Sequence, residues 1–326
     1  MRLFKKISLT VLVVMMTLLV PQMILAQEYP AKPVTVIIPF GPGGGHDLLF
    51  RAVTSVAVDH LGQPIIIRLM PGGGGAIAAD FAAKAAPDGY TLFAGGNIPS
   101  ISLPAIEGRS KGPEYWEPVC RLNYNQTIIV SRPDAPFKTW KQMLEWAKAN
   151  PGKLVVGTPG PWSPPDVIWK TLMKEMGITV KLVPFDGGGP VTVALLGGHI
   201  DVGSALPIIY SPYKNTGKMN ALLTLEDRRL PDLPNTPTSI EEGIPGAATL
   251  NMLGYSWRGV MAPKGTSRAI VDKLASAFKK MTEDPSVKAM IKQYGDEIQY
   301  LGADDFAKVL TSEFNVYKEL GKVYKK

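Results

Sequence analysis

The chain has 326 residues, of which 45% are hydrophobic and 19% are charged, and its formal net charge is +7. Apart from the C-terminal Lys322, Lys325 and Lys326, no dense basic run with interleaved aromatic residues is present, so the composition gives no sign of nucleic-acid binding. Cys120 is the only cysteine, which excludes an intrachain disulfide, and about 300 residues suffice for a core to hold the fold instead. Its neighbour Val119 indicates a thiol buried in a strand.

The first 26 residues have the three parts of a secretory signal peptide. Arg2, Lys5 and Lys6 form a basic start, residues 7–20 are apolar, and residues 24–26 make a small-residue cleavage site. The alternative is a membrane anchor, but the apolar run has about 14 residues where roughly 20 are needed to span a bilayer. No cysteine lies at the cleavage site, which argues against a lipoprotein. We therefore expect an exported, soluble protein, cleaved after about Ala26.

The next segment predicts a strand, a glycine-rich turn and a helix. Residues 34–38 are apolar, glycines occupy positions 43–45, and hydrophobic residues then recur at helical spacing. Glycines let bare backbone N–H groups approach a ligand at the positive end of the helix dipole, so the turn is a candidate seat for a carboxylate or phosphate. Asp47 is either the helix N-cap, which we favour, or a ligand contact. His46 is either a surface-loop residue or a ligand donor.

Strands and helices alternate from residue 34 to about residue 210, which is the pattern of parallel sheets covered by helices on both faces. A chain of this length is expected to divide into two lobes. The predicted strands span residues 34–38, 65–68, 91–94, 126–131, 154–157, 180–183, 201–205 and 221–224. Thr139 is expected to cap one helix and Ser163 the next. From Ser267 onward the chain is predicted to be almost wholly helical, with breaks at 284–285, 295 and 302.

Further glycine or proline loops follow other predicted strands. The loop at 71–77 matches only the loosest dinucleotide-binding pattern, while the turn at 41–47 lacks the third glycine of that pattern and the Gly-Lys-Ser/Thr of a Walker loop. Loops at 157–163 and 184–190 mirror the opening turn in the second half of the chain. Because strand carboxyl ends of two facing α/β lobes meet at the cleft, these loops are expected to converge on one ligand.

The sequence offers no catalytic arrangement. The histidines, His46, His60 and His199, lack the spacing of a metal site, and no Gly-x-Ser-x-Gly nucleophile motif occurs. We therefore expect no enzyme activity, no metal and no cofactor.

Short motifs run in order along nearly the whole mature chain. They are Tyr29-Pro30-Ala31-Lys32-Pro33, Pro39-Phe40 with Gly43-Gly44 and Asp47, Leu61-Gly62-Gln63-Pro64, Pro71-Gly72-x-Gly74-Gly75, Ala86-Pro87-Asp88-Gly89-Tyr90-Thr91-Leu92, Asn150-Pro151-Gly152-Lys153-Leu154, Pro184-Phe185-x-Gly187-Gly188, Leu196-Gly197-Gly198-His199-Ile200-Asp201, Leu233-Pro-Asn-Thr-Pro-Thr238, Trp257-x-Gly259 and Ala262-Pro263-x-Gly265-Thr266. Together they resemble the substrate-binding proteins of tripartite tricarboxylate transporters, the Bug-type family.

The resemblance implies a type II periplasmic binding protein, in which two α/β lobes close on a ligand and deliver it to membrane subunits. Lobe 1 is expected to comprise residues 27–125 and 230–326, and lobe 2 residues 126–229. The implied ligand is a small organic carboxylate, held between the first glycine loop and a loop of the other lobe. The implied site residues are Phe40, Gly43, Gly44, Gly45, His46, Asp47, Gly95, Asn97, Thr158, Gly160, Pro161, Trp162, Ser163, Asp186, Gly187 and Gly188.

Three departures from the family pattern bear on the ligand. His46 replaces a small hydroxyl residue, Leu69 replaces an asparagine, and residues 161–165 replace a smaller glycine or serine loop. His46 and Trp162 facing one pocket would suit a larger carboxylate that is aromatic or more acidic, such as a di- or tricarboxylate or an aromatic acid, through a charge-assisted hydrogen bond and stacking. The expected partners are this carboxylate and the membrane subunits, bound by a monomeric receptor. The alternatives are a sensor that reports to a membrane kinase and an exported enzyme that uses the same cleft.

Overall fold

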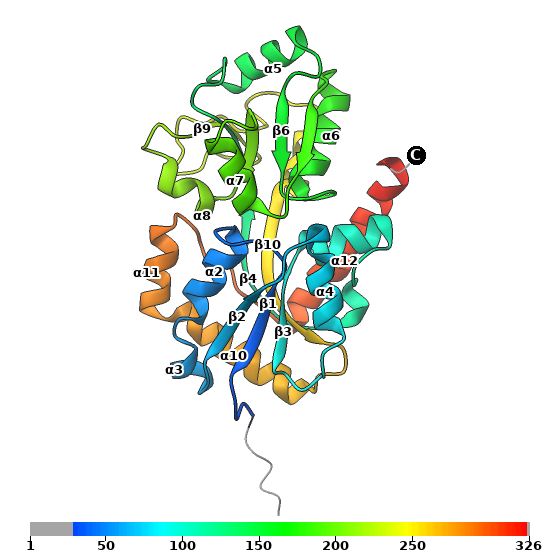
Figure 1. The fold of residues 1–326 in the computed structure, drawn as a ribbon, viewed down its shortest axis with the longest axis vertical. Helices are drawn as coiled ribbons and strands as arrows, with labels where there is room; N and C mark the ends of the chain where they lie inside the picture. Colours follow the sequence, from blue (N-terminus) through cyan, green and yellow to red (C-terminus); the bar gives the residue numbers. More distant parts are fainter. Residues whose placement is uncertain (1–28, 325–326) are drawn as a thin grey trace, which may run out of the picture. The chain divides into compact units, whose positions relative to one another are not determined.

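Two β-sheets organise the described part of the chain, which is residues 29–324 of the computed structural model. The predicted signal peptide lies outside these residues. From Lys32 onward the chain forms one compact unit that contains both sheets. The predicted division into two α/β lobes is confirmed (Figure 1).

The first sheet has six strands in the order β11-β4-β10-β3-β1-β2. β1 pairs in parallel with β2 and β3, whereas β10 is antiparallel to both β3 and β4, and β11 is antiparallel to β4. The strand bounds are β1 Val34–Ile38, β2 Ile65–Leu69, β3 Thr91–Gly96, β4 Trp116–Gln126, β10 Tyr255–Pro263 and β11 Leu301–Gly302.

The second sheet has five strands in the order β7-β6-β8-β5-β9. β6 is parallel to β7 and β8, and β5 is antiparallel to β8 and β9, so each sheet combines the parallel pairing that the alternating pattern predicts with antiparallel strands. The antiparallel strands β5 and β10 are those that enter a sheet directly from the other lobe. The bounds are β5 Ile128–Ser131, β6 Val155–Thr158, β7 Lys181–Pro184, β8 Val202–Ala205 and β9 Asn220–Thr224.

Two segments cross between the lobes. β4 ends at Gln126 in the first sheet, and β5 begins at Ile128 in the second. On the return, helix α9 (Ala247–Gly254) packs against helix α6 (Pro164–Met176) and runs directly into β10. β4 and β10 pair side by side along their length (Figure 1). The lobe boundaries expected at residues 126 and 229 stay a prediction.

The helices begin and end largely at the expected signals. Thr139 Oγ1 accepts the N–H of Gln142 at 3.2 Å, and Ser163 Oγ accepts that of Asp166 at 3.2 Å, so both predicted caps are confirmed. The other helices are α2 Gly45–Thr54, α3 Ala57–Leu61, η1 Gly73–Gly75, α4 Ala76–Ala83, the π-type helix η2 Ile98–Glu107, η3 Pro113–Tyr115, α5 Trp140–Ala149, α7 Gly188–Leu196, α8 Pro207–Tyr210, η4 Ser211–Tyr213, α10 Arg268–Glu283, α11 Pro285–Gln293 and α12 Ala303–Tyr324.

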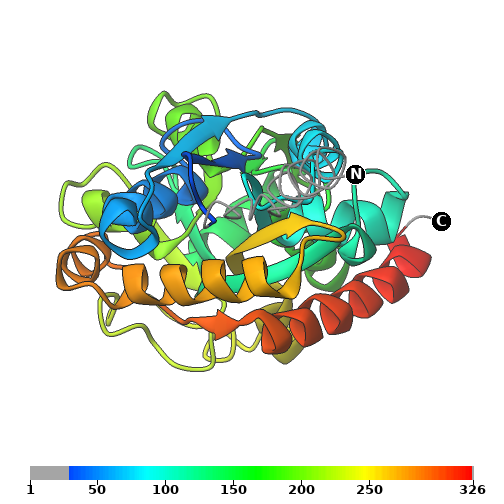
Figure 2. The ribbon, with the colours of Figure 1, turned by 90° about the horizontal axis from the view of Figure 1, so that it is seen from below.

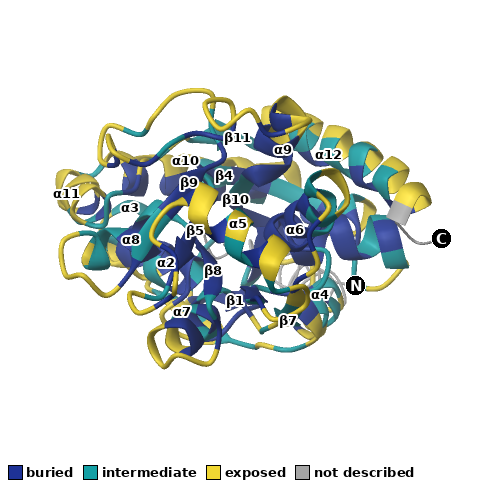
Figure 3. Cartoon of the chain, turned by 90° about the horizontal axis from the view of Figure 1, so that it is seen from above, coloured by how far each residue is buried: buried dark blue, intermediate teal, exposed yellow. Residues whose placement is uncertain are grey.

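Helices cover the first sheet and bury its strands. α10 and α12 both contact β4, and they lie side by side in Figure 2. Figure 3 shows most strands buried, while the outward faces of α11 and α12 are exposed. The long C-terminal segment thus contributes packing, as its amphipathic pattern predicts.

Aromatic side chains make up much of the core of the first lobe. The rings of Phe93 and Trp116 stack at 4.8 Å, and Trp257 meets Phe306 edge-on at 5.1 Å. Cys120 is buried in β4, which confirms the predicted strand thiol, and burial raises the pKa of that thiol. A thiol held in its neutral form here is a packing group and not a nucleophile.

The predicted strand ranges do not include most of β4 or any of β10, although Cys120 indicates a strand at its own position. Polar residues interrupt the apolar pattern of both strands. Asn123 and Asn125 lie in β4 and Arg258 in β10, and all three are buried. From hydrophobic periodicity alone, polar residues at such positions are assigned to the solvent-exposed face of a strand or to a loop. In the folded chain their polar atoms find partners from other elements, so the strands tolerate them.

Gly259→Ala is expected to destabilise the fold by about 1–3 kcal/mol, as overpacking does. A Cβ at Gly259 would lie 2.4 Å from Phe306 Cζ and 2.8 Å from the backbone oxygen of Cys120. Gly302→Ala is the matched control, because a Cβ there meets nothing within 4 Å. Urea unfolding of both variants measures the difference, and equal midpoints would contradict the expected clash.

Candidate functional site

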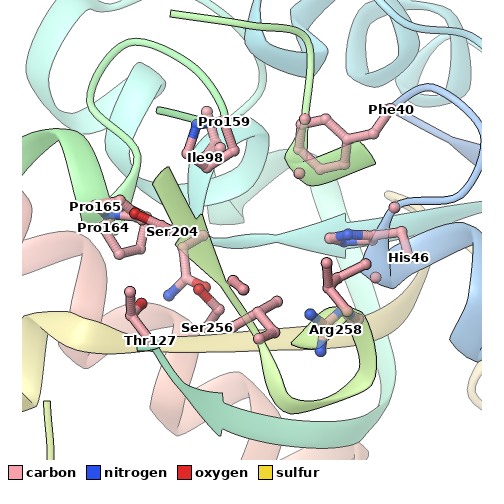
Figure 4. Close-up of a pocket in the computed structure, with 18 of the residues that line it drawn as sticks. Phe40, His46, Ile98, Thr127, Pro159, Pro164, Pro165, Ser204, Ser256 and Arg258 are labelled. Carbon is pink, nitrogen blue, oxygen red and sulfur yellow. The ribbon is translucent and has the colours of Figure 1, made fainter. Parts of the chain in front are cut away.

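A cavity of about 80 Å³ lies between the lobes (Figure 4). Its walls come from both sheets and from the crossing strands. The lining residues are Phe40, Gly44, Gly45, His46, Asn97, Ile98, Thr127, Pro159, Pro164, Pro165, Gly187, Gly188, Ser204, Ala205, Leu206, Ile209, Ser256, Trp257 and Arg258.

Two helices begin at the cavity, one from each lobe. α2 starts at Gly45 and α7 at Gly188, and both residues line the cavity. The first-turn N–H groups of an α-helix have no acceptor within the helix, and the helix dipole places partial positive charge at that end. Two such ends at one cavity make a site that favours an anion.

Glycines let the starts of α2 and α7 touch. The N–H of Gly41 donates to the carbonyl of Asp186 at 3.5 Å, which links the two loops across the lobes. A Cβ on Gly189 would lie 2.5 Å from the carbonyl oxygen of Pro42 and 3.1 Å from the nitrogen of Gly44. Backbone atoms therefore fill the space that a larger side chain needs, and the lobes are in contact at this edge of the cavity.

Asp47 is not the helix N-cap, so that prediction is wrong. The N-cap is Gly44, and Asp47 lies in the first turn of α2. Its Oδ2 accepts the N–H of Gly43 at 3.0 Å and its Oδ1 accepts Arg51 Nε at 2.7 Å. Asp47 is buried outside the cavity lining, and its carboxylate reaches back to the residue before the N-cap. It stabilises the glycine turn.

His46 is a neutral, partly buried residue at the cavity wall. Its Nε2 lies 3.1 Å from the carbonyl oxygen of Gly95, and its ring centroid lies 4.8 Å from that of Phe40. Burial, and secondly the positive charge of Arg258, lower the pKa of His46 to about 3. The proton of the neutral ring is on Nε2, because a carbonyl can only accept. A neutral ring whose N–H is already bonded does not supply the charge-assisted hydrogen bond that the sequence suggests.

Arg258 brings a formal positive charge to the cavity. The side chain is buried, and its Nη1 donates to the oxygens of Asn123 at 3.0 Å and Asn125 at 2.9 Å. These amides donate in turn to Asp296 at 3.1 and 2.6 Å. Burial raises the pKa of Asp296, while the charge of Arg258 opposes that rise. The acid is thus linked to Arg258 through a layer of two amides.

The rest of the lining combines hydroxyl groups with an apolar surface. Thr127 Oγ1 donates to the carbonyl of Gly254 at 2.7 Å, whereas the buried Ser204 Oγ has no partner among the described residues. Ser256 adds a third hydroxyl. The apolar part is formed by Phe40, Ile98, Pro159, Pro164, Pro165, Leu206 and Ile209.

Only part of the set of predicted site residues lines the cavity. Those at its wall are Phe40, Gly44, Gly45, His46, Asn97, Gly187 and Gly188. Those outside the lining are Gly43, Asp47, Gly95, Thr158, Gly160, Pro161, Trp162, Ser163 and Asp186. Several of the second group position the first, as when Gly95 accepts from His46 and Ser163 caps α6.

Trp162 is engaged by other protein groups and not by the cavity. Its indole N–H donates to the carboxylate of Glu107, and the ammonium of Lys170 lies 3.7 Å from its ring centroid. Its backbone N–H donates to Asp166 at 2.9 Å. With the ring face and both N–H groups occupied, stacking of Trp162 on a ligand has no support in this arrangement.

Sequence reasoning missed the walls contributed by the crossing strands and by the β8–α8 segment. Thr127 precedes β5, Ser256 and Arg258 lie in β10, and Ser204 lies in β8. The sequence signal for Arg258 is a charged residue within Trp257-x-Gly259, but its meaning depends on knowing that β10 passes the cavity.

Two kinds of feature are absent from residues 29–324. No group of three His, Cys, Asp or Glu side chains there could hold a metal ion. Within the same range, no helix has the length and apolar character needed to cross a bilayer.

His46 is expected to make stability depend on acid. Its lowered pKa means that only the unfolded state takes up the proton between pH 6.5 and about 3, so stability falls as pH decreases through that window. From pH 7 to pH 5 the wild type should lose up to about 2 kcal/mol more than His46→Gln. Urea unfolding at both pH values measures this, with the exposed His199→Gln as control. Equal pH dependence in wild type and His46→Gln would contradict the neutral ring.

The pH dependence of stability must be compared between variants, because Glu313 changes the stability of every variant in the opposite direction as pH falls. Burial raises the pKa of Glu313 to about 7, so its contribution decreases as pH rises from about 4.5 to 7. Glu313 is present in all three proteins, and its contribution cancels in the difference.

Gly189→Ala is expected to hold the lobes apart. The new methyl group would meet backbone atoms of the opposite loop that cannot yield, so the radius of gyration measured by small-angle X-ray scattering should increase. Gly188→Ala is the matched control, because its Cβ would meet nothing within 4 Å. Indistinguishable scattering from the two variants would show that the glycine contact does not limit closure.

Comparisons with known proteins agree with this geometry. Residues 49–324 match the Tripartite tricarboxylate transporter family receptor. BugT of Bordetella pertussis is 31% identical over 255 residues, covering 76% of this chain and 75% of BugT. A solved periplasmic transporter has a TM-score of 0.84 at 30% identity, covering 90% of this chain and 97% of that one. MatC of Rhodopseudomonas palustris with bound malate has a TM-score of 0.80 at 27% identity, covering 90% of this chain and 100% of MatC.

The family match covers most of both lobes, and the cavity-lining residues Phe40, Gly44, Gly45 and His46 precede it. The solved relatives share the arrangement of two mixed sheets over nearly their whole length. The chain therefore belongs to the tripartite tricarboxylate transporter receptor family, the TctC/Bug-type periplasmic solute-binding proteins, which bind ligands and are not enzymes.

Proposed function

We propose that this receptor captures a small organic carboxylate in the periplasm and delivers it to the membrane subunits of a tripartite transporter. The observation that carries the proposal is the convergence of two helix N-termini and the Arg258 cation on one cavity between the lobes. None of the described residues that line the cavity is Asp or Glu. The lining thus favours an anion and offers no acidic group to a cationic ligand.

The relatives support a carboxylate over other anions. MatC, which shares the fold at 27% identity, has malate bound, and malate is a small dicarboxylate. A cavity of about 80 Å³ suits a short molecule of this class. We infer the same chemical class for this chain and leave the individual acid to experiment.

Closure of the lobes is the step that we propose the transporter reads. A ligand shifts an equilibrium between open and closed forms only if it makes better contacts in one of them. A carboxylate between the starts of α2 and α7 would contact both lobes at once and so favour the closed form. The signal peptide would direct export of the chain to the periplasm and would be cleaved after about Ala26.

Native mass spectrometry of the mature chain with a pool of mono-, di- and tricarboxylates tests the proposal. We expect retention of one or a few acids with unchanged mass, and no retention of neutral sugars of similar size. Retention of a sugar in place of the acids would overturn the proposal. Appearance of a product mass would instead favour the enzyme alternative.

A further inference from the structure

We propose that the guanidinium of Arg258 and the hydroxyl of Ser204 are ligand-binding groups that hold opposite ends of a short organic acid. A carboxylate would lie at Arg258, and a second oxygen, from a hydroxyl or a second carboxylate, would lie at Ser204. This inference rests on the proposed function and narrows the substrate class to acids that carry oxygen at both ends.

Arg258 has donor capacity that the protein does not use. The residue is 1% exposed, and although Nη1 donates to two asparagines, the buried Nε has no partner among the described residues. A buried N–H group without an acceptor is costly, and charged groups lose most. Arg258 lines the cavity, so an oxygen of a bound acid could accept this hydrogen bond.

The charged guanidinium of Arg258 lies beside a second source of positive charge, the N-terminus of helix α2. Its Nη2 would be only 2.5 Å from a Cβ on Gly45, which places the guanidinium against the first residue of α2. A cation beside a helix N-terminus is electrostatically unfavourable. Asp296 offsets it through the amides of Asn123 and Asn125. A carboxylate at this point would neutralise both positive groups directly.

Ser204 supplies the second unsatisfied group. It is 8% exposed and lies in β8, and its Oγ has no partner among the described residues. In Figure 4 Ser204 lies toward Pro164 and Pro165, whereas Arg258 lies on the side of His46. A ligand oxygen that meets Ser204 is therefore separate from the carboxylate that meets Arg258.

The two groups come from different lobes, which links them to closure. Arg258 is in β10 of the first sheet, and Ser204 is in β8 of the second. The other buried side-chain atoms without partners among the described residues, in Trp140, Thr158 and Trp169, lie outside the cavity lining. An acid with oxygen at both ends would satisfy both groups at once and hold the lobes together.

Isothermal titration of the mature chain with succinate, 4-hydroxybutyrate and butyrate tests the Ser204 end. Butyrate carries the carboxylate but no oxygen at its other end. We expect it to bind about 3- to 10-fold more weakly than the other two acids, the usual effect of one neutral hydrogen bond. Ser204→Ala should remove this preference, leave butyrate binding unchanged and keep or raise the Tm, because an unsatisfied hydroxyl is deleted.

Arg258→Gln tests the charged end. Binding of all three acids should weaken by about 10- to 100-fold, as expected when a hydrogen bond to a charged group is lost. The affinity of Arg258→Lys for the acids should lie between those of wild type and Arg258→Gln, because lysine keeps the positive charge but lacks the planar guanidinium with its paired donors. If Arg258→Gln folds poorly beside Asp296, the double variant Arg258→Gln with Asp296→Asn removes both buried charges. Arg268→Gln, at an exposed ion pair, is the control and should bind as wild type does.

The outcomes separate this inference from the proposed function. Binding of succinate by Arg258→Gln or by the double variant within twofold of wild type would overturn the role of Arg258. An unchanged preference in Ser204→Ala would overturn the role of Ser204. If native mass spectrometry finds a retained carboxylate but wild type binds none of the three probes, the receptor function stands and the restriction to short acids with oxygen at both ends is wrong.

Discussion

The backbone contact between Gly189 and the turn at Pro42 and Gly44 is the constraint on which the site depends. Any side chain at 189 would collide with the opposite loop, so only glycine lets the starts of α2 and α7 meet. Their meeting closes one edge of the cavity and brings two partial positive charges together there. The contact between the lobes therefore lies at the same helix starts whose first residues, Gly45 and Gly188, line the cavity.

The charges around the cavity follow from this convergence. Burial and the positive charge of Arg258 both disfavour a protonated His46, so its ring stays neutral and donates to the carbonyl of Gly95. Arg258 keeps the charge that a guanidinium always carries, and Asn123 and Asn125 connect it to Asp296. The site is thus positive but incompletely paired, which is the condition under which an anionic ligand contributes most.

The sequence predicts the local parts of this arrangement well. The strand at Val34–Ile38, the caps at Thr139 and Ser163 and the glycine loops before α2 and α7 all lie where the residue patterns indicate. Each depends on neighbours within a few positions. Asp47 shows the limit of that reasoning, because an acid near a helix start suits both the N-cap and the first turn, and the position of the turn decides between them.

The strands that connect the lobes and the far walls of the cavity do not follow from local patterns. Arg258 and Ser204 become cavity residues because β10 and β8 pair with strands distant in sequence, and Trp162 is drawn away by Glu107 and Lys170 from other turns of the chain. Short-range hydrogen bonding and hydrophobic periodicity predict the helices, most of the strands, the turns and the glycine loops at the helix starts. Which buried polar groups stay unpaired, and which of those line the cavity, depends on long-range strand pairing, because only the assembled lobes determine what each side chain meets.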